Sequence, residues 1–95
     1  MTNERVRFGL VGAGAIAQTW AQAFQTTDDA ELTAVCDVRD EPARAFAEPF
    51  GAAVFDDPTA LAKSGACDAV VVCSPPASHL DVALAMIHEG VAVLC

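Results

Sequence analysis

The sequence is poor in basic residues, and this scarcity excludes one large class of partners. Only five of its 95 residues are lysine or arginine, against thirteen aspartates and glutamates, which gives a formal net charge of -8. Nucleic-acid surfaces select lysine and arginine because these residues neutralise backbone phosphates. No apolar run approaches the roughly 18 residues needed to cross a bilayer, and no signal-peptide core follows the polar first residues. We therefore expect a cytoplasmic protein without nucleic-acid or membrane partners.

The four cysteines lack the spacing of a metal site or a disulfide framework. No two of them form a C-x-x-C pair. Cys36, Cys73 and Cys95 each end an apolar run, and Cys67 lies just before one. This placement predicts buried, reduced structural thiols and no bound metal.

Short apolar runs alternate with longer helical patterns along the whole chain. Strands are predicted over 6–11, 32–36, 53–55, 69–73 and 91–95, and helices over 15–25, 41–50, 58–63 and 77–89. The run at 69–73 is apolar without alternation, which is typical of a central parallel strand covered on both faces. Alternating strands and helices give a parallel sheet with right-handed crossovers. The length suits one such domain.

Proline, glycine and aspartate residues indicate where the predicted helices begin and end. Pro42 lies in the first turn of the second helix and Gly51 follows its end, while Pro49 predicts an early stop or a distorted last turn. Asp57 predicts an N-cap before Pro58. Helical spacing also places two apolar sets on one face each. These sets are Ile16, Trp20, Ala23 and Phe24 in the first helix, and Leu80, Ala83, Leu84 and Ile87 in the last.

The segment between the first strand and the first helix carries the strongest functional signal. Gly12, Gly14 and Ala17 occupy the three positions of G-x-G-x-x-G/A. In that motif the first glycine allows a tight turn, the second lets a pyrophosphate approach the backbone, and the third position packs the helix on the sheet. The backbone N–H groups of the first helical turn, at Ala15 and Ile16, then face the phosphates. A P-loop is excluded, because no Gly-Lys-Ser/Thr ending is present.

An acidic residue completes the dinucleotide-binding pattern. Asp37 ends the second strand, 37 - 17 = 20 residues beyond Ala17, where a carboxylate accepts hydrogen bonds from the adenosine ribose. Arg39 could stack on the adenine, neutralise a 2′-phosphate, or lie solvated in the loop. Asp37 would repel a 2′-phosphate, so NAD is favoured over NADP as the cofactor. Together these features predict an α/β, Rossmann-type doubly wound parallel sheet of five strands, in the order 3-2-1-4-5.

The chain resembles the Gfo/Idh/MocA oxidoreductases over essentially its whole length. The resemblance rests on residues 6–17 (VRFGLVGAGAIA), 34–37 (AVCD) and 72–79 (VCSPPASH). It implies that Ser74, Pro75, Pro76 and His79 line the nicotinamide side of the cofactor, with His79 near it. An alternative for His79 is a histidine of the first helical turn that is hydrogen-bonded to the backbone.

The sequence departs from this family in two places. Members often carry Gly-Lys-His before the fifth strand, where this chain has Gly90, Val91 and Ala92. The family also continues after the last cysteine with Glu-Lys-Pro, whose lysine contributes to catalysis, and then with a second α/β domain that supplies the substrate pocket. We therefore expect residues 1–95 to be the dinucleotide-binding domain alone, inactive by itself, with the catalytic residues unknown.

Three functions are compatible with these residues. The leading interpretation is an oxidoreductase that transfers a hydride between nicotinamide and an alcohol carbon of a sugar-like or polyol-like small molecule. The alternatives are a non-catalytic NAD-binding sensor, and a methyltransferase, which ranks low because Leu10 and Val11 stand where such loops carry an acid. An uncovered edge on the fifth strand would also favour self-association into a homo-oligomer.

Overall fold

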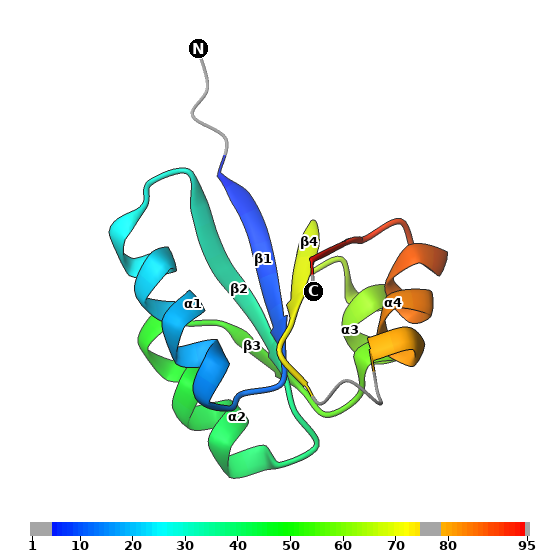
Figure 1. Cartoon of the computed structure of the whole chain (residues 1–95), viewed down its shortest axis with the longest axis horizontal. Coiled ribbons are helices and arrows are strands. Elements are labelled where there is room, and N and C mark those ends of the chain that lie inside the picture. Colours follow the sequence, from blue (N-terminus) through cyan, green and yellow to red (C-terminus); the bar gives the residue numbers. More distant parts are fainter. Residues whose placement is uncertain (1–4, 75–78, 95) are drawn as a thin grey trace.

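The computed structural model describes residues 5–74 and 79–94, in which one parallel sheet lies between two layers of helices (Figure 1). Its five strands follow the predicted order β3-β2-β1-β4-β5. The strands are β1 (Val6–Val11), β2 (Ala30–Cys36), β3 (Ala53–Phe55), β4 (Ala69–Val72) and β5 (Ala92–Leu94). The helices are α1 (Ala15–Thr26), α2 (Asp40–Ala47), the short 3-10 helix η1 (Glu48–Phe50), α3 (Pro58–Ser64) and α4 (His79–His88).

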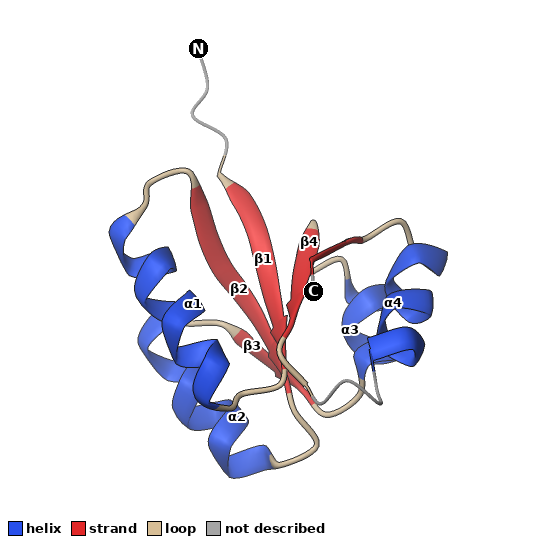
Figure 2. Ribbon diagram, in the orientation of Figure 1, coloured by secondary structure: helices blue, strands red, loops and turns tan. Residues whose placement is uncertain are grey.

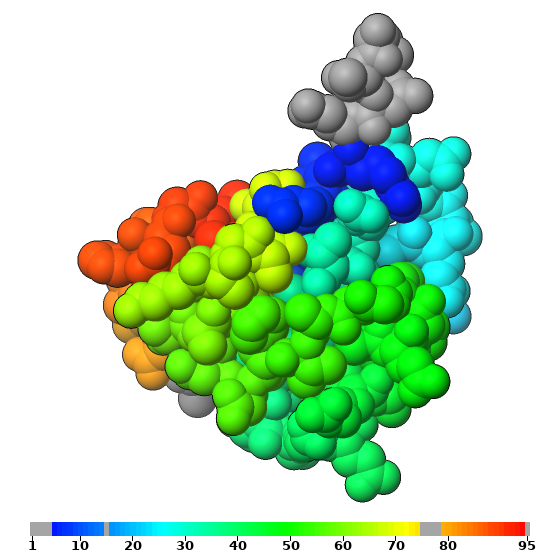
Figure 3. All heavy atoms as spheres, turned by 180° about the vertical axis from the view of Figure 1, so that it is seen from behind, coloured from blue at the N-terminus to red at the C-terminus, as the bar shows by residue number. Residues whose placement is uncertain are grey.

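The helices form two layers, one on each face of the sheet. Helices α1 and α2 cover one face of the sheet, and α3 and α4 cover the other (Figure 2). The space-filling view from behind shows the atoms of α3 and α4 side by side (Figure 3). Consecutive strand residues point to opposite faces, so Leu10 and Val71 pack with α1 and α2, while Val11 and Val70 pack with α3 and α4. All four residues of β4 are buried, which confirms the prediction of a central strand covered on both faces.

The helix ends and the helix cap predicted from proline, glycine and aspartate are confirmed. The second helix stops at Ala47, and Pro49 lies in the 3-10 helix that follows. Gly51 then adopts a left-handed conformation with φ of 64°. Asp57 caps α3 by accepting a hydrogen bond from the Thr59 N–H at 3.3 Å. The predicted first residues of the last helix, 77 and 78, lie outside the described residues.

Of the apolar residues picked out by helical spacing in the two helices, Phe24 is buried as expected, but most of the others lie at the surface, so most of this expectation was wrong. Helix α1 buries Ala17, Ala21 and Phe24, leaving Ile16 67% exposed. Helix α4 buries Val82 and Met86. The exposed apolar residues of α4 are Leu80, Leu84 and Ile87. Alanine has little bulk, so α1 can lie close to the sheet along Ala17 and Ala21, while Ile16 and Trp20 lie at the surface.

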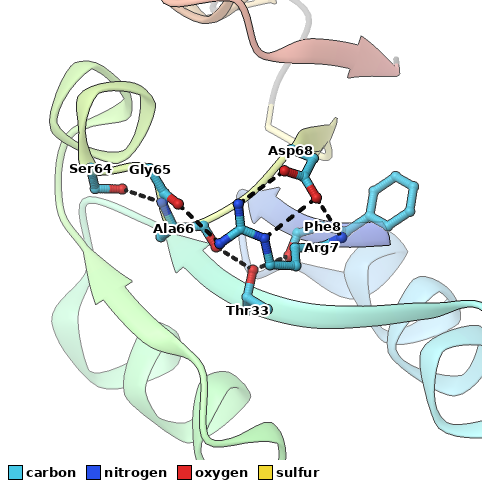
Figure 4. Close-up of polar contacts among 7 residues, drawn as sticks. All are labelled: Arg7, Phe8, Thr33, Ser64, Gly65, Ala66 and Asp68. Carbon is cyan, nitrogen blue, oxygen red and sulfur yellow. Dashed lines mark hydrogen bonds and ion pairs between the residues drawn. The ribbon is translucent and has the colours of Figure 1, made fainter. Parts of the chain in front are cut away.

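An arginine–aspartate pair joins β1 to β4 at the amino edge of the sheet (Figure 4). The Nη2 of Arg7 donates to Oδ1 of Asp68 at 2.9 Å, and Nη1 donates to the Gly65 carbonyl at 3.1 Å. The backbone N–H of Arg7 also donates to the side-chain Oδ2 of Asp68, and the backbone N–H of Asp68 donates to the Arg7 carbonyl. This amino-edge pair is half exposed on both sides, with Asp68 51% accessible.

Beside this pair, β1 and β2 change register. Phe8 pairs with Leu32 and Gly9 with Ala34, which leaves Thr33 as the extra residue of a bulge. The Thr33 hydroxyl lies 2.6 Å from the Ala66 carbonyl oxygen and 3.3 Å from that of Phe8, so the shorter contact takes its proton (Figure 4).

Two of the three described thiols are buried as predicted, and the third is less so. Cys36 and Cys67 are free and buried, and Cys73 is free and half-buried. Burial raises the pKa of Cys36 to about 12, which keeps it as an inert thiol. Cys95 lies outside the described residues. Across the described ranges, no helix has the length and apolar character required to traverse a membrane.

Candidate functional site

The candidate site lies at the carboxyl edge of the sheet, where the chain turns in opposite directions. From β1 the sheet grows toward β2 on one side and toward β4 on the other, which is the point where doubly wound sheets bind their ligands. The loop of Gly12, Ala13 and Gly14 leaves β1 at this point. It is fixed to β2 by a hydrogen bond of 2.7 Å from Gly12 N to the Cys36 carbonyl.

Gly12 is required for more than the tight turn that the sequence predicted. Its φ is 97°, in the left-handed region that glycine favours. A Cβ added here would lie 2.7 Å from the backbone N of Ser74 and 2.8 Å from the carbonyl carbon of Cys73. The loop therefore touches the chain leaving β4. Sequence reasoning missed this contact, because no local signal reports an approach between segments far apart in the chain.

Gly14 has the opposite surroundings. It is the N-cap of α1 in an extended conformation, and a Cβ added to it would meet no atom within 4 Å. No side chain caps this helix end, and its first turn carries no acidic residue. Ala15 begins α1, and Ile16 follows in the same turn. The space over Gly14 and the positive helix end suit a phosphate group, which needs backbone N–H donors and no lysine.

Ala17 meets the third requirement of the motif. It is completely buried and packs in the cluster of Leu10, Ala21 and Val35 between α1 and the sheet. A small residue at this position lets α1 pack closely against the strands, as the motif requires.

Asp37 is buried at the end of β2, and the chain itself supplies four hydrogen-bond donors to it. Its side chain is only 6% exposed. Oδ2 accepts from the Ala13 backbone N–H at 2.9 Å and from Arg39 Nη2 at 2.8 Å. Oδ1 accepts from the Arg39 backbone N–H at 2.9 Å and from Arg39 Nε at 3.1 Å.

These contacts fix the charge of Asp37. The guanidinium of Arg39 and the backbone N–H groups of Ala13 and Arg39 hold the pKa of Asp37 far below its usual range, against the opposing effect of burial. The carboxylate is therefore ionised throughout the physiological range. Through Ala13 it also fastens the glycine loop to the end of β2.

The pairing of Arg39 with Asp37 was not among the sequence interpretations. Arg39 is 60% exposed, so its side chain lies at the surface as expected of a loop residue, but it is not simply solvated. The signal that could have found the pair is the spacing Asp-x-Arg after a strand. An Asp in that position folds back onto the N–H two residues on, which brings the following arginine beside it.

The other side of the loop holds Ser74 and His79. His79 is the first residue of α4, and its Nε2 lies 2.7 Å from the Ser74 carbonyl oxygen. A carbonyl only accepts, so Nε2 carries the proton and donates. This is the backbone-bonded histidine that the sequence left as an alternative. Pro75 and Pro76 lie outside the described residues.

The predicted site residues thus fall into two groups with the glycine loop between them. Ala13 joins the loop to Asp37 and Arg39, and Gly12 abuts Ser74, which in turn binds His79. One side presents a buried carboxylate with an exposed arginine, and the other a histidine held by the backbone. Among the described residues, no group of three or more His, Cys, Asp or Glu side chains is placed to hold a metal ion.

The same residues and fold occur in known proteins. Residues 6–95 match a family described as an oxidoreductase family with an NAD-binding Rossmann fold. The chain is 40% identical to D-glucoside 3-dehydrogenase of Escherichia coli K12, over all of this chain and 28% of that protein. It is 34% identical to scyllo-inositol 2-dehydrogenase (NADP(+)) of Bacillus subtilis, over 95% of this chain and 28% of that protein.

A solved dehydrogenase structure has the same fold as this chain. The WlbA dehydrogenase of Bordetella pertussis, solved with NADH and UDP-GlcNAcA, superposes with a TM-score of 0.88 at 33% identity. The match covers 95% of this chain and 28% of that one. The chain therefore belongs to the Gfo/Idh/MocA oxidoreductase family and is a Rossmann domain of the dehydrogenase type. It spans little more than a quarter of the length of these relatives, and membership excludes the methyltransferase alternative.

Proposed function

We propose that this chain is the cofactor-binding domain of an NAD-dependent dehydrogenase that oxidises an alcohol carbon of a sugar or polyol. The observation that carries the proposal is the open amino end of α1 at Gly14, flanked by the buried carboxylate of Asp37. The named relatives support the substrate class, since they act on a glucoside and on an inositol. All three are dehydrogenases, and no observation favours the non-catalytic sensor.

The described residues fit a dinucleotide in two places. We place the pyrophosphate over residues 12–16, because no side chain caps the amino end of α1 and a Cβ at Gly14 would meet no atom within 4 Å. We place the adenosine ribose at Asp37, whose fixed negative charge suits hydroxyl donors. When bound, the nicotinamide would accept the hydride. The residues of this chain would position that cofactor, with Ser74, Pro75, Pro76 and His79 on its nicotinamide side.

We propose NAD rather than NADP as the cofactor. Asp37 is ionised and buried, so a 2′-phosphate that took the place of the ribose hydroxyl beside it would meet a charge of the same sign. The Bacillus subtilis relative is named for NADP(+) and the Bordetella pertussis structure holds NADH, so the cofactor differs among similar chains. Asp37→Ser removes the charge and should shift the ratio of NAD to NADP affinity toward NADP by about tenfold or more. An unchanged ratio in calorimetric titrations would exclude Asp37 as the ribose ligand.

We assign no residue of this chain to acid–base catalysis. Among the residues that the structure describes, His79 is the titratable group on the proposed nicotinamide side, and its Nε2 proton is engaged by Ser74. A second domain that supplies the proton acceptor and the substrate pocket belongs to the proposal, as do a cytoplasmic location and self-association. An alcohol is oxidised only when its proton is removed and its carbon is oriented toward the nicotinamide.

The experiment is the titration of NAD into Gly14→Val. The new side chain enters the space over the helix end, where a Cβ meets nothing within 4 Å. We expect NAD affinity to fall about tenfold to a hundredfold through lost phosphate contacts, with only a small change in thermal stability. Gln22→Val, on the exposed surface of the same helix, is the matched control and should bind normally. Unchanged affinity in Gly14→Val would refute the proposal.

A further inference from the structure

The carboxylate of Asp37 is fully engaged before any ligand arrives. A carboxylate offers about four acceptor positions, two on each oxygen. Here two are taken by the Ala13 and Arg39 backbone N–H groups and two by the Nε and Nη2 of the Arg39 side chain. A ribose could therefore reach Asp37 only if one of these partners left.

Only one of the partners can leave at low cost. The two backbone N–H groups are part of the glycine loop and of the turn after β2, so their departure would require those segments to move. The Arg39 side chain is long, 60% exposed and held in the structure by Asp37. Rotation about its own bonds carries the guanidinium into water, where its charge is solvated.

We infer that Arg39 covers the ribose-binding oxygens of Asp37, so that a nucleotide with a free ribose diol binds by displacing its guanidinium. A forked guanidinium and a vicinal diol both present two donors to the two oxygens of a carboxylate, so each occupies the place of the other. Arg39 thereby restricts affinity for the adenosine half of the ligand. This inference rests on the proposed function, because the ligand is the dinucleotide assigned to the same edge of the sheet.

The sign of the effect separates this role from the alternatives. An arginine that contacts the nucleotide, or merely attracts its phosphates, would strengthen binding, and its removal would weaken it. An arginine that must be displaced weakens binding, and its removal strengthens it. Arg44 gives a matched control: it lies on α2, it is paired with the exposed Asp40, and its loss removes the same charge without freeing Asp37.

The test uses ADP and 2′,3′-dideoxy-ADP, which differ only in the ribose hydroxyls, titrated calorimetrically into the protein and its variants. We expect Arg39→Ala to bind ADP and NAD about threefold to tenfold more tightly than the wild type. Dideoxy-ADP should gain nothing from the same change. Arg44→Ala should bind ADP as the wild type does, or slightly more weakly.

Arg39→Lys keeps the charge but lacks the fork, so its ADP affinity should lie between those of the wild type and Arg39→Ala. It also serves if the alanine variant loses stability. Weaker ADP binding by Arg39→Ala, or an equal gain for ADP and dideoxy-ADP, would overturn the inference while leaving dinucleotide binding intact. Failure of the wild type to bind either NAD or ADP would instead overturn the proposed function, and this inference with it.

Discussion

Two arginine–aspartate pairs lie at opposite edges of the same sheet, and they differ in how deeply the carboxylate is placed. At the amino edge, Arg7 and Asp68 are both about half exposed and tie β1 to β4 (Figure 4). At the carboxyl edge, Arg39 is exposed but Asp37 is nearly inaccessible and also holds the glycine loop. Similar pairs of side chains thus serve as a surface clamp at one edge and as part of a candidate ligand site at the other.

The difference follows from what each edge must do. The charges of an exposed ion pair are solvated in both the folded and the unfolded protein, so breaking the pair changes the free energy of unfolding little. A buried carboxylate has lost its water and depends on every partner, so the loss of a partner affects both stability and binding. The predictions below separate the two edges, and they run from the largest expected effect to the smallest.

Gly12→Ala should give the largest loss of stability. Its Cβ would lie within 3 Å of the backbone at Cys73 and Ser74, which cannot yield as a side chain can, and φ is 97°. We expect more than about 4 kcal/mol of destabilisation, or no folded protein, measured by chemical denaturation. Gly9→Ala is the comparison, because its Cβ meets the side chains of Cys67 and Val70 at 3.1 and 3.3 Å. A stable Gly12→Ala protein would show that the loop does not pack as described.

Asp37→Asn and Asp68→Asn test the two pairs directly. An amide in place of the Asp37 carboxylate would keep the shape but lose charge-assisted bonds at a buried position, so we expect a loss of about 1–3 kcal/mol in the free energy of unfolding. Asp68→Asn should cost less, because the amino-edge pair is screened by water. Urea denaturation of both variants measures the difference. Equal losses would mean that burial does not distinguish the two edges.

The dependence of stability on acid pH should also differ between the two arginine–aspartate pairs. Arg39 lowers the pKa of Asp37 in the folded state, so this group stabilises the fold above its unfolded pKa of about 4. That stabilisation is lost as the pH falls from about 4 through the lower folded pKa. Asp37→Asn should therefore lose stability less steeply below about pH 4 than the wild type. Asp68, whose pKa is lowered by Arg7, should account for less of the acid dependence; parallel curves for wild type and Asp37→Asn would contradict this assignment.

Thr33→Val should have the smallest effect of the four. The shape of the side chain is kept, but the bulge loses the hydrogen bond to the Ala66 carbonyl. We expect a loss of about 1 kcal/mol in the free energy of unfolding, without any change in NAD affinity, because the amino edge lies away from the proposed site. A change in NAD affinity would mean that the two edges are coupled.

The sequence by itself determined the strand order, the ends of the helices and the position of the proposed phosphate site. The strand order follows from the alternation of strands and helices along the whole chain. The other two features depend on neighbours within a few residues. Glycine at position 14 leaves the end of α1 open, Pro49 cannot continue α2, and Asp57 reaches the N–H of its own helix's first turn. Such effects are the same in any fold that contains the segment, so they can be predicted from the local pattern.

Only the tertiary structure decided which surfaces meet. Helical spacing placed Ile16 and Leu84 on apolar faces, but the helices pack on the sheet through Ala17 and Met86. Close packing against the strands selects the side chains that fit the available space. The contact of Gly12 with Ser74 needs β1 and β4 to be neighbours. The burial of Asp37 under Arg39 likewise needs the glycine loop to supply the N–H of Ala13, and no stretch of sequence around residue 37 contains that donor.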